Sequence, residues 1–183
     1  EMKRRIRSGI GDQDTALICT FHGFGVQLLR EDIHTLQYPD DFLVLDEDDA
    51  ETLLRHVYET AKISSSKYTY SMAKTLIGER KQDLGYIESF RELDIAPLRQ
   101  QYEQAQTTED KIFFGYLYEQ RKCYGLDFDD LIYMTLYILQ HYEEKRQKWQ
   151  ERLEYIMVDE FQDVSARQYE LVSILSGYHQ NLF

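Results

Sequence analysis

Residues 158–163 ("VDEFQD") place two adjacent carboxylates at the end of a mostly apolar run. The preceding residues, "YIMV", are short and continuous, as in a buried parallel strand. In open α/β sheets, ligands bind beyond the carboxyl ends of the strands. In nucleotide hydrolysis, an aspartate at that place helps to hold Mg²⁺, and an adjacent carboxylate can orient or deprotonate the attacking water. The other interpretation is an ordinary strand that ends in a solvated acidic turn.

Two further segments combine polar and aromatic groups. In "TFHGF" (residues 20–24) the structural interpretation is a pair of core phenylalanines beside a hydrogen-bonded histidine. In "LDFDDLI" (residues 126–132), Asp127 directly precedes an apolar helical stripe and is predicted to be its N-cap. Asp129 and Asp130 are either surface charges or braces for the neighbouring loop, and we favour a structural role.

The elements around these segments predict two strand–helix units that flank a long helical stretch. The strand candidates are residues 15–21 ("TALICTF") and 154–160 ("EYIMVDE"), and we expect them to lie parallel and adjacent, or nearly so. Residues 40–125 show helical spacing of apolar side chains. Within this stretch, helices are predicted to begin at a cap of Asp46 or Asp48, at residue 72, and at a Thr/Asp cap near residue 107, and another is predicted over residues 86–105. A last helix is predicted from a Ser165 cap to a Gly177 C-cap.

Composition limits the classes of function. The chain has 183 residues, enough for one medium domain or two small ones, and 33 acidic against 21 basic side chains give a net charge of −12. This charge argues against a simple basic nucleic-acid module but leaves room for nucleic acid in a local groove. Cys19 and Cys123 fit no metal-ligand spacing and are predicted to be thiols in a reducing compartment. No apolar run approaches a membrane span, so we expect a soluble, cytoplasmic protein with no membrane partner.

Four segments, in order, resemble the UvrD/Rep-like DNA helicases of superfamily 1. "VDEFQDVSARQYELVSIL" is similar to that family's Walker B segment and the helix after it. "EMKRRI" resembles the end of its motif Ia, "TFHGFGVQLLRE" its TFHSF segment, and "LDFDDLI" its DFDDL segment. Gly23 replaces the commoner serine, which removes a hydroxyl but lets the backbone approach a phosphate.

The resemblance covers nearly the whole chain and implies a fold. It implies a mainly α protein with a small α/β portion, in which a helical insert interrupts a partial RecA-like parallel sheet. Residues 1–39 and 126–183 would be part of the ATP-binding domain, called 1A, and residues 40–125 would be the helical 1B subdomain.

The resemblance also implies roles for the acidic segment. Asp159 would belong to the Mg²⁺ shell, and Glu160 would activate the hydrolytic water. Gln162 and Asp163 would link the state of the nucleotide to neighbouring motifs. ATP and Mg²⁺ are therefore the implied cofactors.

The other matched segment implies contacts with nucleic acid. Thr20, Phe21, His22 and Phe24 would lie along the path of single-stranded DNA, where aromatic faces stack on bases and small polar groups bond phosphates. The basic residues 3–7 are predicted to be a solvated helix face. The aromatic run "FFGYLYEQRKCY" is predicted to be core of the helical segment.

The implied activity is that of an ATP-dependent DNA helicase or translocase that moves 3′→5′ on single-stranded DNA. The chain contains no G-x-x-x-x-G-K-[ST] loop. We therefore expect the P-loop segment and a second motor domain in the rest of a longer protein, and we expect this chain alone to be inactive. Two alternatives stay open: a non-catalytic helical interaction domain with a vestigial acidic pair, and part of a helicase–nuclease subunit of the AddA/RecB type.

Overall fold

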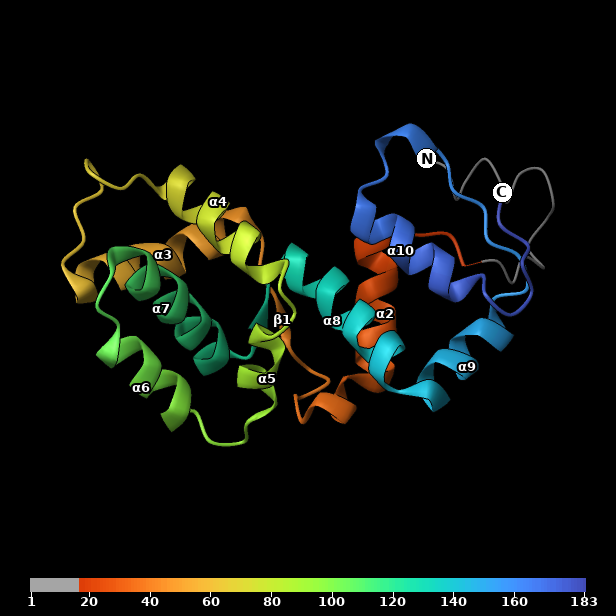
Figure 1. Ribbon diagram of the computed structural model, residues 1–183, viewed down its shortest axis with the longest axis horizontal. Helices are drawn as coiled ribbons and strands as arrows, with labels where there is room; N and C mark the ends of the chain where they lie inside the picture. The colour runs from red at the N-terminus through yellow and green to blue at the C-terminus, as the bar shows by residue number, and fades with distance from the viewer. Residues whose placement is uncertain (1–16) are drawn as a thin grey trace.

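Helices make up most of the computed structural model, which describes residues 17–183 (Figure 1). Its helices are α2 (Phe21–Asp32), η1 (Ile33–Leu36), α3 (Glu47–Ala61), α4 (Tyr70–Lys81), α5 (Tyr86–Arg91), α6 (Ala96–Gln104), α7 (Thr108–Cys123), α8 (Phe128–His141), α9 (Glu143–Arg152), η2 (Phe161–Asp163) and α10 (Ala166–Leu175). Its strands are β1 (Leu43–Val44) and β2 (Gly125–Leu126). The prediction of a mainly α fold with a small α/β portion is confirmed.

The helices gather into two lobes (Figure 1). Helices α3 to α7 form one lobe, which we call the helical lobe, and α2, α9 and α10 lie on the other side, with α8 between them. Strands β1 and β2 pair in parallel, with Leu43 opposite Gly125 and Val44 opposite Leu126. The chain therefore enters and leaves the helical lobe through neighbouring strands. The division into a 1A-like part and a 1B-like part stays a prediction.

Local side-chain bonds explain where the helices begin. Asp46, Thr107, Asp127 and Ser165 each accept a hydrogen bond from a backbone N–H in the first turn of the helix that follows. Asp127 and Ser165 were predicted N-caps, Asp46 was one of two candidates, and a Thr/Asp cap was expected near residue 107. Each supplies an acceptor to an N–H that has no partner inside its helix. At the other end of α10 the helix stops at Leu175 with Ser176 as its cap, one residue before the predicted position.

The prediction of a strand over residues 15–21 is wrong for the described part of it. Residues 17–20 have no regular structure, and α2 begins at Phe21. The Thr20 hydroxyl accepts a hydrogen bond from the Gly23 N–H at 3.1 Å, which starts a helix where the β-branched composition indicated a strand. The apolar residues Phe24 and Leu28 then share the buried side of α2.

The strand predicted over residues 154–160 is reduced to an extended segment with a single bridge, and its neighbour differs from the expected one. The Ile156 N–H bonds to the Asn181 carbonyl at 2.9 Å, and the Val158 N–H bonds to the Phe183 carbonyl at 2.8 Å. Ile156 and Leu182 form a parallel bridge. Within residues 17–183 this segment therefore pairs with the last residues of the chain, and not with residues 17–20 as expected.

One predicted helix is divided in two. The expected helix over residues 86–105 ends at Arg91, and α6 starts at Ala96. Pro97 lies in the first turn of α6, where it needs no hydrogen-bond donor. Inside one continuous helix its missing N–H and its ring would break the hydrogen-bond ladder. The Asp94 carboxylate accepts a hydrogen bond from the Ala96 N–H and starts the new helix. The helix α9 was not predicted.

The core extends through both lobes. The aromatic run of α7 contributes Phe113 and Tyr116, as predicted, and α8 is buried along most of its length. Trp149, the chain's one tryptophan, is fully buried between α9 and α2. No helix in residues 17–183 is both long and apolar enough to cross a membrane. The predicted basic helix face at residues 3–7 lies outside the described residues.

Candidate nucleotide and nucleic-acid sites

The acidic segment forms a small network of its own at the end of the short strand. The Glu160 N–H donates to the Asp159 carboxylate at 3.0 Å. The Gln162 amide donates to the Glu160 carboxylate, and the Asp163 N–H donates to the Glu160 carbonyl at 2.9 Å. All four side chains are exposed. The two carboxylates are therefore held by their own neighbours and remain open to a ligand.

Glu160 has an unusual backbone conformation. Its φ is 50° and its ψ is 45°, in the left-handed region that non-glycine residues seldom occupy. Four other residues in the described part of the chain share a positive φ: Gln37, Lys62 and Tyr124 are helix C-caps, where this conformation is ordinary, and Gln180 follows the turn after α10. Glu160 instead lies between a strand end and the short helix η2. Strain of about 1–3 kcal/mol at such a position is typical of functional sites.

The donor set of this segment suits one kind of metal site. Among residues 17–183, no three His, Cys, Asp or Glu side chains are grouped as a metal cage. Protein-bound Mg²⁺ typically uses one or two carboxylates together with water and substrate phosphates, and needs no such cage. Asp159 and Glu160 therefore fit a shared Mg²⁺–phosphate site and do not fit a structural metal site.

The residues of the "TFHGF" segment take different places. Thr20 is the N-cap of α2, and Phe24 is 8% exposed with its ring edge-on to Trp149 at 5.4 Å. Phe21 is half-buried and packs against the core. His22 is half-buried on the first turn of the helix. Of the aromatic groups, Phe21 and His22 keep surface that a base could reach, whereas the Phe24 ring supports α2 from inside.

Phe128 joins this surface and was missed in the sequence. Its ring lies 5.3 Å from the His22 ring and is 43% exposed. The signal was present, because an aromatic residue in the first turn of a helix, directly after its N-cap, has little core to enter. Asp129 lies beside it and is exposed. The two segments predicted separately therefore meet at one place.

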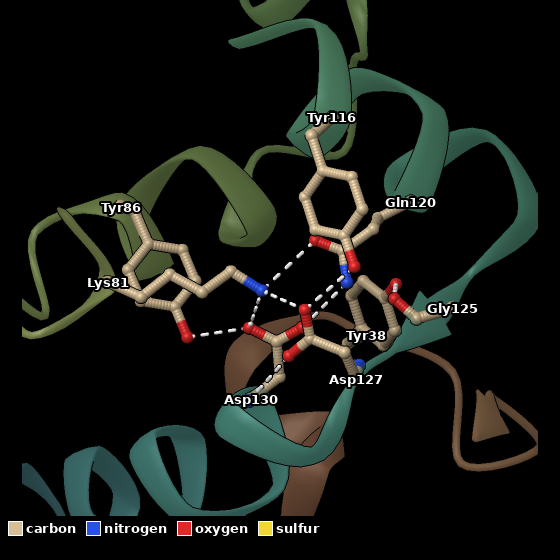
Figure 2. A network of polar contacts seen from close by, with 8 residues as sticks. All are labelled: Tyr38, Lys81, Tyr86, Tyr116, Gln120, Gly125, Asp127 and Asp130. Carbon is tan, nitrogen blue, oxygen red and sulfur yellow. Dashed lines mark hydrogen bonds and ion pairs between the residues drawn. The ribbon is translucent and has the colours of Figure 1, made fainter. Parts of the chain in front are cut away.

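Beneath this surface lies a cluster of buried polar groups that we call the Lys81 cluster (Figure 2). Its members are Lys81, Tyr86, Tyr116, Gln120, Asp127 and Asp130. The Lys81 ammonium lies 2.7 Å from the Asp127 carboxylate and 2.8 Å from that of Asp130. Its third partner is the Gln120 side-chain oxygen at 3.2 Å. The predicted structural role of Asp130 is thereby confirmed, while Lys81 was not predicted to take part.

The carboxylates of the Lys81 cluster are saturated with donors. Asp130 accepts hydrogen bonds from the Tyr86 hydroxyl at 2.7 Å and the Gln120 amide at 2.8 Å. Asp127 accepts from the Tyr116 hydroxyl at 2.9 Å. Burial and then the charge of Asp127 raise the pKa of Asp130 to about 7. Burial opposes ionisation of Asp127 too, but the charge of Lys81 holds the pKa of Asp127 below its ordinary value.

A second buried carboxylate connects α2 to α9. The Asp32 side chain is 1% exposed and accepts hydrogen bonds from the Trp149 indole N–H and the Lys148 ammonium, both at 2.8 Å. Lys145 lies 3.3 Å from the same carboxylate. Helix α9 leads directly into the strand that ends at Asp159. The two candidate surfaces share no hydrogen bond or ring contact in residues 17–183. They are related through this packing and through α10, which follows the acidic segment and packs on α8.

Comparison with known proteins assigns the chain to a family. The UvrD/REP helicase N-terminal domain family matches residues 1–183. The chain belongs to this family. It is 32% identical over 184 residues to the ATP-dependent DNA helicase Rep of Salmonella typhimurium, covering 97% of this chain and 25% of that protein. It is 28% identical over 186 residues to the ATP-dependent DNA helicase PcrA of Staphylococcus aureus, covering 100% of this chain and 24% of that protein.

The match covers only part of each relative. The chain spans about a quarter of the length of these curated relatives. The names of Rep and PcrA describe whole proteins. The family is thus established for this chain, and the activity of a whole protein that contains it is a matter for proposal.

Proposed function

We propose that this chain is part of the first motor domain of an ATP-dependent DNA helicase, and that it couples nucleotide hydrolysis to movement along single-stranded DNA. The observation that carries the proposal is the acidic strand end, where Glu160 holds a left-handed backbone beside Asp159. Membership of the UvrD/REP family supports it. Movement in the 3′→5′ direction stays a prediction from the family resemblance.

Asp159 would contribute a carboxylate to the shell of Mg²⁺ bound with ATP. When bound, that ion supplies positive charge to the phosphates and neutralises the charge that develops on them. Asp159 already accepts a hydrogen bond from the Glu160 N–H, which fixes the orientation of its carboxylate. Its other oxygen accepts no hydrogen bond and forms no ion pair among the described residues, and it is available to a ligand.

Glu160 would orient the attacking water and accept its proton. The exposed carboxylate receives a hydrogen bond from the Gln162 amide, which holds the side chain in one direction. Gln162 and Asp163 follow in η2, so a change in their position reaches Glu160 directly. This is the basis for proposing that these two residues relate the state of the nucleotide to the rest of the motor.

Single-stranded DNA would pass over the first turns of α2 and α8. Phe21, His22 and Phe128 offer ring faces for stacking, and Thr20 brings the start of a helix, where backbone N–H groups favour a phosphate. Phe24 would act from below, by fixing α2 on Trp149. The net charge of −12 opposes DNA at long range, so binding should be weak. Contacts between local cations and phosphates release counterions, so the binding that these contacts provide should fall as salt rises.

The catalytic assignment is tested in the longer protein that carries this chain. Glu160→Gln keeps the volume of the side chain and removes the base, so DNA-stimulated ATP turnover should fall by about 10²–10⁴ while binding of ATP and DNA persists. Asp159→Asn should also change the dependence on Mg²⁺ concentration. Glu154→Gln, an exposed change on the same segment, is the matched control. Turnover within a few-fold of wild type for Glu160→Gln would place the base elsewhere.

The nucleic-acid assignment is tested on the chain itself. A labelled oligothymidylate is titrated at low salt and followed by fluorescence anisotropy. Phe21→Ala and His22→Ala should weaken binding by about tenfold each, since one stacked base contributes about 1–3 kcal/mol. His34→Ala, an exposed histidine in η1, is the control. Equal binding by all variants would show that DNA does not follow this segment.

A further inference from the structure

The first turn of α8 divides its side chains between two environments. Asp127 and Asp130 turn inward to the Lys81 cluster (Figure 2). Phe128 and Asp129 turn outward, Phe128 toward His22 and Asp129 toward Gly78 of α4. A groove of about 240 Å³ runs between this turn and helices α3 and α4. The same four residues thus form both a buried anchor and part of an exposed surface.

The anchor comes from the helical lobe. Lys81 is the last residue of α4, and its side chain has no exposed surface. An ammonium has three N–H groups, and those of Lys81 are taken up by Gln120, Asp127 and Asp130. Moving this ammonium away would leave two buried carboxylates without a counter-charge, which is strongly unfavourable. The position of the turn is therefore tied to the end of α4.

We propose that Lys81 is a positioning residue for the nucleic-acid surface, which holds the first turn of α8 so that Phe128 lies against His22. That the ligand is nucleic acid rests on the proposed function above, whereas the placement of Phe128 by Lys81 does not. Lys81 itself touches no part of the exposed surface. It acts through Asp127 and Asp130, and they fix the backbone that carries Phe128.

The role of the charge can be separated from the role of the cap. One oxygen of Asp127 accepts the Asp130 N–H at 3.0 Å and caps α8. The other oxygen accepts from Lys81 and from Tyr116. Asparagine is as good an N-cap as aspartate. In Asp127→Asn, the amide oxygen can keep the cap, but the amide N–H₂ then faces the Lys81 ammonium, donor against donor. This variant loosens the anchor and keeps the helix start.

The test is the ring contact itself, measured by proton NMR on the 183-residue chain. A ring beside an imidazole displaces the resonances of its C–H protons, and His22→Gln identifies which resonances belong to His22. Phe128→Leu gives their position without the neighbouring ring. In Lys81→Met, the His22 resonances should move most of the way to that position. In Lys122→Met, which removes a charge from an exposed ion pair with Glu119, they should not move.

Folding is monitored in the same spectra. The Trp149 indole N–H, bonded to Asp32 outside the helical lobe, gives one resonance that should stay unchanged. If Lys81→Met does not fold, Asp127→Asn provides the measurement, and its His22 resonances should move in the same direction. If Lys81→Met folds and its His22 resonances stay at the wild-type position, the proposal is overturned. If only Asp127→Asn folds, unchanged His22 resonances in that variant overturn it.

A binding measurement distinguishes this inference from the proposed function. Lys81→Met should weaken binding of a labelled oligothymidylate by the same factor as Phe128→Leu, about tenfold, and Lys122→Met should weaken it far less. If Phe128→Leu binds as wild type, the surface does not hold DNA and the proposed function loses that part. The His22 resonances still decide whether Lys81 positions Phe128.

Discussion

Two glycines of α2 have opposite surroundings. A Cβ added at Gly25 would lie 2.6 Å from the Leu131 carbonyl oxygen of α8, a distance that side chains do not adopt. A Cβ at Gly23 would lie 3.3 Å from the Thr20 hydroxyl and 3.4 Å from Cys19, on an exposed position. Gly25 is therefore required where the backbones of α2 and α8 approach, while Gly23 has no such neighbour.

Substitution by alanine should separate these two roles. Gly25→Ala forces α2 away from α8 and should lower the free energy of unfolding by about 1–3 kcal/mol, as overpacking in a core does. Gly23→Ala should be neutral or slightly stabilising, because alanine loses less backbone entropy than glycine in a helix. Chemical denaturation of both variants measures the difference. Equal stability would mean that the two helices adjust without cost.

One buried carboxylate joins α2 to α9. Asp32 is buried, yet it receives donors from Trp149, Lys148 and Lys145 of the facing helix. Burial works against ionisation, but the hydrogen bonds from Lys148 and Trp149 hold the pKa of Asp32 below its ordinary value. Ionised Asp32 thus stabilises the fold above the pKa that it has in the unfolded chain.

Asp32→Asn should lower the free energy of unfolding at neutral pH by about 1–2 kcal/mol, because hydrogen bonds to a charged acceptor weaken. The stabilisation should be present above about pH 4 and should disappear as pH falls through the depressed pKa. Glu31→Gln is the control: its ion pairs with Lys148 and Arg152 are partly exposed, and losing them should cost less than about 1 kcal/mol. Urea unfolding at pH 7 and pH 3 measures both.

Asp130 affects the stability of the whole molecule with the opposite dependence on pH to that of Asp32. The pKa of Asp130 is raised to about 7 by burial and by the neighbouring Asp127 charge. A raised carboxyl pKa means that the folded protein holds the proton more tightly than the unfolded chain. Asp130 should therefore cost stability as pH rises from about 4 to about 7, and its contribution should level off above that range.

Asp130→Asn should remove this dependence. Relative to the variant, the free energy of unfolding of the wild type should fall by on the order of 2–4 kcal/mol as the pH rises from 4 to 7. Comparison with the variant cancels the other titrating groups. A difference that does not change with pH would show that Lys81 keeps Asp130 ionised throughout, and that burial does not govern its charge.

Interactions between residues close in the sequence could be predicted, and interactions between distant residues could not. The N-caps at Asp46, Asp127 and Ser165 depend on residues within three positions, and the sequence contained all of that information. The family resemblance, which also depends on short segments, was confirmed. Lys81 meets Gln120 and Asp130 across 39 and 49 positions, and no local pattern marks that meeting. The strand expected over residues 15–21 failed in its described part for the same reason, because a strand exists only with its neighbour.

The extended segment at residues 156–158, which is bonded to the last residues on one side, has a consequence for the behaviour of the protein at high concentration. Ile156 and Val158 direct their N–H groups to residues 181–183, so Met157, which lies between them, directs its own backbone groups to the opposite side. Met157 is 79% exposed and Tyr155 is 63% exposed, and neither makes a backbone hydrogen bond within residues 17–183. Such an open edge can accept a strand from another copy. The net charge of −12 keeps copies apart at low ionic strength, so added salt should promote self-association, and Met157→Lys should suppress it in light-scattering measurements.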